Sequence, residues 1–116
     1  MKDKILLHSQ DIAAALVTRL EGTEPKSESL VLYEDAHTGM RIKYLKYLKG
    51  NVTAFHRHTC GHGFYVLSGT LYTDVGNYEP GSFVWFERGC EMVHGAKYED
   101  VECLMITDSA FAIEYL

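Results

Sequence analysis

The chain has 116 residues, of which 47% are hydrophobic and 23% are charged, and this balance excludes a disordered chain. The length suits one domain, so we expect residues 1–116 to form a single unit. The formal net charge is −5, and the lysines and arginines are mostly scattered. This distribution argues against a nucleic-acid partner, which needs a concentrated positive surface.

The sequence also bounds where the protein is expected to work. No apolar stretch at the start is long enough for a signal peptide, and no later segment is long enough to span a bilayer. The three cysteines, Cys60, Cys90 and Cys103, are odd in number and form no Cys-x-x-Cys pair, which favours reduced thiols. We therefore expect a cytoplasmic protein with no membrane partner.

The N-terminal region has one segment of helical character. Its apolar residues recur at helical spacing after Ser9 and end before Gly22, namely Ile12, Ala13, Leu16, Val17 and Leu20. This pattern predicts a short helix, although residues 15–20 could instead lie extended across a sheet. Residues 21–29 are polar and contain Pro25, which indicates a loop.

From Leu30 onward, short apolar runs alternate with turn residues. About eight to ten short strands are predicted, at 29–33, 40–48, 52–58, 63–67, 70–75, 82–86, 92–94, 101–107 and 111–115. So many strands in one small chain favour a sandwich or a small barrel. In the second strand the basic residues Arg41, Lys43, Lys46 and Lys49 alternate with apolar ones, and we interpret them as a solvated face.

Histidines give the strongest functional signal. His56 and His58 lie two residues apart in a predicted strand, so both imidazoles leave the same face. His62 follows closely, and His94 lies in a later strand. Imidazole is the commonest metal ligand in proteins, so a shared divalent metal ion is the leading hypothesis. The alternative is a surface strand that happens to carry two histidines.

The spacing around these histidines resembles the first motif of the cupins. That motif runs from a glycine through His-x-His and a glutamate to a second glycine, and this chain matches each interval from Gly50 through His56 and His58 to Gly69. His62 stands where the glutamate is usual. The second cupin motif is only partly present after Gly81, with Glu87 in place of a proline and Met92 in place of the histidine. His94, two residues later, lies on the same strand face as Met92.

This resemblance implies an all-β fold, the cupin double-stranded β-helix or jelly-roll barrel, with its core at about residues 39–107 and a short N-terminal helix outside it. It also implies one divalent transition metal, Fe, Zn or Ni, held by His56, His58 and His94. Glu91 is a weaker substitute for His94. His62 is either a fourth ligand or a group beside the metal. Neutral imidazole ligands suit transition metals better than Mg²⁺ or Ca²⁺.

Cupins with all-histidine sites include oxygenases that cleave β-diketones and hydroxyacetophenones, and this chain is similar to that group. The similarity implies a non-haem iron dioxygenase acting on a small enolisable carbonyl compound, with His62 and Glu87 as candidate catalytic residues. Tyr65, Tyr72 and Trp85 are candidates for lining the pocket, and core packing is the alternative for these aromatic side chains. Cupins commonly pair through outer strands, so a homodimer is expected.

Two other functions remain open from the sequence. One is a non-catalytic zinc-binding cupin that senses or binds a small molecule, in which four histidines saturate a tetrahedral ion. The other is a metal-free cupin isomerase or epimerase, in which the histidines act as acid and base.

Overall fold

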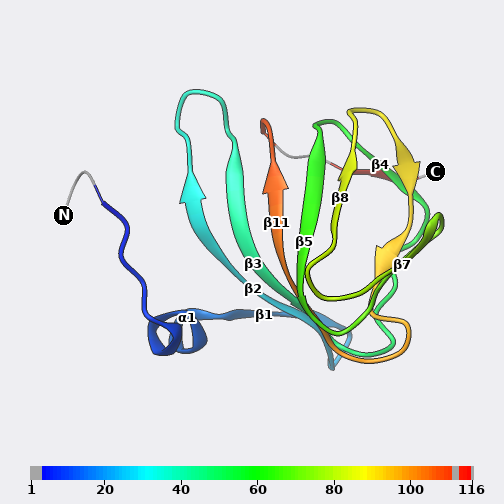
Figure 1. Ribbon diagram of the computed structural model, residues 1–116, viewed down its shortest axis with the longest axis horizontal. Coiled ribbons are helices and arrows are strands. Elements are labelled where there is room, and N and C mark those ends of the chain that lie inside the picture. The colour runs from blue at the N-terminus through cyan, green and yellow to red at the C-terminus, as the bar shows by residue number, and fades with distance from the viewer. Residues whose placement is uncertain (1–3, 111–112, 116) are drawn as a thin grey trace.

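The computed structural model describes residues 4–110 and 113–115, and most of these residues lie in antiparallel strands (Figure 1). The largest sheet has six strands in the order β1-β2-β3-β11-β5-β8. Their bounds are β1 Val17–Glu21, β2 Glu24–Glu34, β3 Arg41–Tyr47, β11 Val101–Thr107, β5 His62–Ser68 and β8 Phe83–Phe86.

Two three-stranded sheets complete the fold, in the orders β10-β6-β7 and β12-β4-β9. The first comprises β10 His94–Gly95, β6 Leu71–Thr73 and β7 Gly76–Tyr78; the second comprises β12 Ile113–Tyr115, β4 His56–His58 and β9 Glu91–Met92. Figure 1 shows the large sheet spreading across the molecule from β2 to β8, with β4 and β7 on its right-hand side. The predicted all-β class is confirmed.

The core follows from the period-two alternation of the strands. In β11, Val101, Cys103 and Met105 are buried, and the residues between them are partly exposed. Leu45 faces Cys103 from β3, and Val66 faces Cys103 from β5, so one row of inward side chains crosses three strands. The buried cluster contains Leu45, Tyr47, Phe64, Val66, Leu71, Phe86, Met92, Ala96, Val101, Cys103 and Met105.

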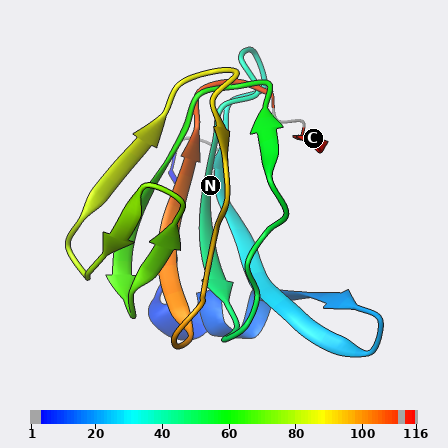
Figure 2. The same cartoon turned by 90° about the vertical axis from the view of Figure 1, so that its right-hand side faces the viewer.

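The N-terminal segment is part helix and part strand. Helix α1 covers Ser9–Ala15, and β1 begins at Val17, so the extended alternative applies to the second half of the predicted helix. The loop predicted at 21–29 is wrong, because β2 begins at Glu24 and pairs with β1. Pro25 is accommodated opposite Leu20, beside a register shift in this hairpin, where a missing N–H is tolerated. Figure 2 shows the hairpin projecting from the body of the molecule.

The strand predicted at 52–58 is shorter than expected. Only His56–His58 forms β4, and Val52 makes an isolated bridge to Gly95. The residues between them leave the strand, because Thr53 makes hydrogen bonds to the backbone of His94.

Among the described residues, no helix has the length and apolar character needed to cross a membrane.

Candidate metal centre

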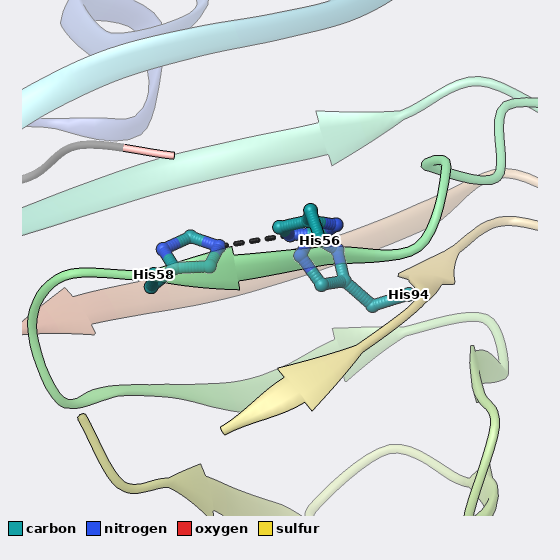
Figure 3. Close-up of side chains that lie close together, drawn as sticks. All are labelled: His56, His58 and His94. Atoms are coloured by element: carbon teal, nitrogen blue, oxygen red, sulfur yellow. Dashed lines mark hydrogen bonds between the residues drawn. The ribbon is translucent and has the colours of Figure 1, made fainter. Parts of the chain in front are cut away.

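Three buried histidines meet inside the fold. His56 and His58 come from β4 and His94 comes from β10, and one ring nitrogen from each lies within 4.8 Å of the others (Figure 3). The exposed fractions of these residues are 1%, 1% and 3%. Arg57, between the two β4 histidines, points the other way and pairs with Glu91 at 3.0 Å. The spacing of two therefore places both imidazoles inside, as the sequence predicts.

Hydrogen bonds at the far side of two rings fix their orientation. Nδ1 of His56 donates to the carbonyl oxygen of Ala54 at 2.7 Å, so the Nε2 atom of the neutral ring carries the lone pair. This Nε2 lies 3.0 Å from Nε2 of His58. Nδ1 of His94 is 2.8 Å from the hydroxyl of Tyr47. Metal-binding histidines commonly hold a carbonyl or another polar group through their second nitrogen in this way.

The surroundings of Nε2 of His94 indicate whether a metal ion fits the site. This atom is buried and has no hydrogen-bond partner among the described residues. A buried polar atom without a partner is costly, and a bound ion would satisfy it. The residues present therefore fit one transition-metal ion, held by His56, His58 and His94.

The backbone holds His94 in place from the segment before β4. The N–H of His94 donates to Oγ1 of Thr53 at 3.1 Å, and the N–H of Thr53 donates to the carbonyl of His94 at 2.9 Å. Gly95 has a φ of +156°, and a Cβ atom there would clash with the carbonyl oxygen of Asn51. Only glycine allows β10 to approach this segment so closely.

Electrostatics keep the site neutral in the absence of a metal. Burial, together with the neighbouring His62 and His56, lowers the pKa of His58 to about 3. Burial, with the same neighbours and His58, also lowers the pKa of His94 well below its ordinary value. At neutral pH these two rings are therefore uncharged and available as ligands. The three-histidine group contains no carboxylate, so it would leave the full charge of a divalent ion uncompensated.

His62 lies beside the three converging histidines. It is fully buried on β5, and its ring stacks on His58 with the centroids 3.6 Å apart and the planes 20° apart. Burial is the main cause that lowers its pKa to about 4, after the opposing effects of the Cys60 backbone and the charge of Asp108. Whether His62 is a fourth ligand or a neighbouring group stays a prediction.

The other residues expected at the site lie elsewhere. Glu87 is exposed in the turn after β8. Tyr65 and Trp85 are 41% and 38% exposed, because alternation turns them outward opposite the buried Phe64 and Phe86. Tyr72 packs with Tyr98 and Lys97. None of Glu87, Tyr65, Tyr72 and Trp85 lines the cavity beside the histidines, so the expected aromatic lining is not found there.

A cavity of about 130 Å³ adjoins the three histidines. Its walls also include Arg19, Lys26, Ser27, Ser29, Lys43, Leu45, Tyr47, Asn51, Thr53 and Met105. The interpretation of the basic series in β3 as a solvated face is therefore wrong for Lys43. Lys43 shares the inward face of β3 with Leu45 and Tyr47. The spacing of two between these residues was a signal in the sequence that could have shown this.

Comparison with known proteins gives the family. The sequence profile described as the ChrR cupin-like domain matches residues 12–112, which is most of the chain. The chain belongs to this cupin family. The resemblance drawn from the histidine spacing is thus confirmed, whereas no curated protein matches the sequence significantly.

Solved structures confirm that the fold is that of the cupins. The polyketide cyclase RemF from Streptomyces resistomycificus is 16% identical, with a TM-score of 0.77, and the match covers 96% of this chain and 84% of that one. A protein from Methylibium petroleiphilum PM1, proposed to be an acetylacetone dioxygenase, is 11% identical, with a TM-score of 0.77 and coverages of 100% and 85%. A cupin-like protein of unknown function from Ralstonia eutropha JMP134 is 14% identical, with a TM-score of 0.73 and coverages of 94% and 69%.

Proposed function

We propose that this cupin is a non-haem iron dioxygenase that acts on a small enolisable carbonyl compound. The observation that carries the proposal is the convergence of three buried histidines beside a cavity, with His62 outside the converging group. Three protein ligands leave coordination positions open, whereas four would saturate a tetrahedral site. Similarity in fold to a proposed acetylacetone dioxygenase agrees with this function, although fold alone does not decide it.

Each residue has a definite role in this proposal. His56, His58 and His94 hold the ion, and Tyr47 and the carbonyl of Ala54 orient two of the rings. A ferrous ion, when bound, supplies open positions and the redox chemistry that dioxygen requires. His62 is the candidate for exchanging the proton that the substrate loses on enolisation; burial lowers its pKa, which leaves it uncharged at neutral pH and also makes it a weak base. Glu87 has no role in this proposal, because it is exposed in the turn after β8 and does not line the cavity.

Oxygen consumption tests the proposal. The protein would be stripped of metal, loaded anaerobically with one equivalent of Fe²⁺ and mixed with acetylacetone and related β-diketones in an oxygen electrode. We expect oxygen uptake that depends on substrate and iron, and its loss in the His94→Ala variant. Zinc-loaded protein serves as the control without redox chemistry. If no compound in the panel causes uptake while bound iron is confirmed by metal analysis, the proposal fails.

The complete burial of His62 and its stacking on His58 favour one second candidate, a non-catalytic zinc-binding cupin. In this alternative a small shift of His62 completes a closed four-histidine zinc site. X-ray absorption of zinc-loaded wild type and His62→Gln distinguishes the two. A loss of one nitrogen ligand in the variant supports the closed site, and an unchanged ligand count supports three histidines with open positions.

A further inference from the structure

Three basic residues, Arg19, Lys26 and Lys43, belong to the lining of the cavity that adjoins the histidines. Lys26 precedes the buried Ser27 on β2, so its side chain leaves the opposite face and the argument concerns the other two. Lys43 comes from β3 and Arg19 from β1, and both belong to the residues around the 130 Å³ space. Arg19 pairs across the sheet with Ser27, which pairs in turn with Tyr47. Because directly opposed residues share a face, the β1-β2 hairpin carries Arg19 to the face from which Tyr47 reaches His94.

The wall of the cavity is positive. None of the described residues that line it is acidic. Arg41, on the same face of β3, pairs with Glu34 at 2.6 Å, but Arg19 has no carboxylate within 4 Å in the part of the chain that the structure describes. Burial lowers the pKa of Lys43, and the charges of Arg41 and Arg19 lower it further. These cations therefore repel one another, and an anion between them would relieve that repulsion.

The volume of the cavity limits what enters it. An apolar cavity of about 150 Å³ binds benzene, which has six carbon atoms, so about 130 Å³ encloses a ligand of roughly six non-hydrogen atoms. Leu45 and Met105 give the space an apolar side, while Ser27 and Ser29 add hydroxyl groups. A ligand that fits is short, with one charged end and one end near the histidines.

We propose that the cavity selects a small carbonyl compound bearing a carboxylate, which Lys43 and Arg19 bind while the carbonyl end faces the three histidines. Lys43 is half-buried and makes the stronger contact. Arg19 is exposed at the mouth of the cavity, so solvent weakens its contribution. The carbonyl group of the ligand rests on the proposed function. Its carboxylate does not, because it is inferred from the basic residues in the cavity wall.

Calorimetric titration with a matched pair of probes tests the selection. Acetoacetate carries a carboxylate, and methyl acetoacetate is the same skeleton with the charge removed. Zinc-loaded protein prevents turnover, so only binding is measured. We expect wild type to bind acetoacetate at least tenfold more tightly than the ester. Lys43→Met weakens acetoacetate binding by roughly tenfold to a hundredfold, and Arg19→Gln weakens it by about twofold to fivefold.

Lys46→Met is the matched control, since Lys46 lies on the same strand as Lys43 but on the opposite face. It should leave both affinities unchanged. Thermal melting establishes that each variant is folded. If Lys43→Met is unfolded, the test uses Arg19→Gln and the affinity of wild type for acetoacetate at 50 and 500 mM salt, which should be weaker at the higher salt concentration. Equal affinities of wild type for acid and ester overturn the inference, even if neutral β-diketones are oxidised. Preference for the acid supports it, even if no oxygen is consumed.

Discussion

At the scale of single residues, the chemistry of the site depends on groups that touch the histidines from behind. Tyr47 reaches Nδ1 of His94, and the carbonyl of Ala54 accepts from His56. Such contacts fix the ring orientation and raise the basicity of the ligand nitrogen. The sequence reveals the histidines by their spacing, but it gives no comparable signal for Tyr47, because eight tyrosines are present and any of them could pack in the core.

Replacing Tyr47 with phenylalanine should weaken metal binding without unfolding the protein. The change removes only the hydroxyl that orients His94, and we expect a tenfold to hundredfold loss of affinity. Competition with a chromophoric chelator measures it. Tyr44→Phe is the control, because Tyr44 lies on the opposite face of β3 and its hydroxyl donates to Glu102. Equal loss in both variants would show that Tyr47 does not act through His94.

The cysteines should differ in reactivity. Burial raises the pKa of all three thiols, that of Cys103 to about 12, but Cys90 is only half-buried whereas Cys60 and Cys103 are buried. Because the thiolate is the reactive form, an aromatic disulfide reagent at pH 8 should modify Cys90 first and the other two only after denaturation. Mass spectrometry of timed samples identifies the site. Rapid modification of Cys103 in the folded protein would contradict its burial.

At the scale of elements, the pairing of strands brings His94 to the other histidines. Strand β9 pairs with β4 and β10 pairs with β6, so the chain changes sheets between Met92 and His94. Met92 therefore lies opposite His56 in the ladder, while His94 turns toward the same interior. The second cupin motif has its histidine at the position of Met92. In this chain the histidine comes two residues later, and the change of sheet between Met92 and His94 still brings it to the site.

Gly95→Ala tests the close approach beside His94. A Cβ atom there would lie against the backbone of Asn51, so we expect a loss of stability about 1–3 kcal/mol larger than in Gly89→Ala, together with weaker metal binding. Gly89 is the matched control, because it has a φ of +80° but open space around it. Denaturant unfolding and metal titration measure both effects. Similar losses of stability in the two variants would mean that the positive φ angle, and not the contact with Asn51, causes the destabilisation.

At the scale of the whole molecule, the six-stranded sheet leaves β8 at one edge. Tyr65, Leu67, Phe83 and Trp85 are exposed on the outward face of β5 and β8, and the rings of Phe83 and Trp85 stack at 6.4 Å. Apolar residues beside an open edge suit pairing with a second copy of the chain. The homodimer expected from the sequence stays a prediction, as does the single-domain organisation.

Light scattering at several protein concentrations measures the assembly. We expect the mass of a dimer for wild type and a shift toward monomer for Phe83→Glu, since the charge would be buried in the interface. Val75→Glu is the control, because Val75 is exposed outside β5 and β8. A monomeric wild type would refute the dimer. A dimer that is unaffected by Phe83→Glu would place the interface elsewhere.

The sequence by itself determined the all-β class, most strands and the pair His56 and His58, because alternation with a period of two is a local property of the chain. It did not determine the hairpin from Val17 to Glu34, where pairing overrides the polar composition and Pro25. Only the tertiary structure showed that Lys43, Tyr47 and Arg19 line one cavity with the histidines. Their positions depend on contacts between strands far apart in sequence, which no local pattern encodes.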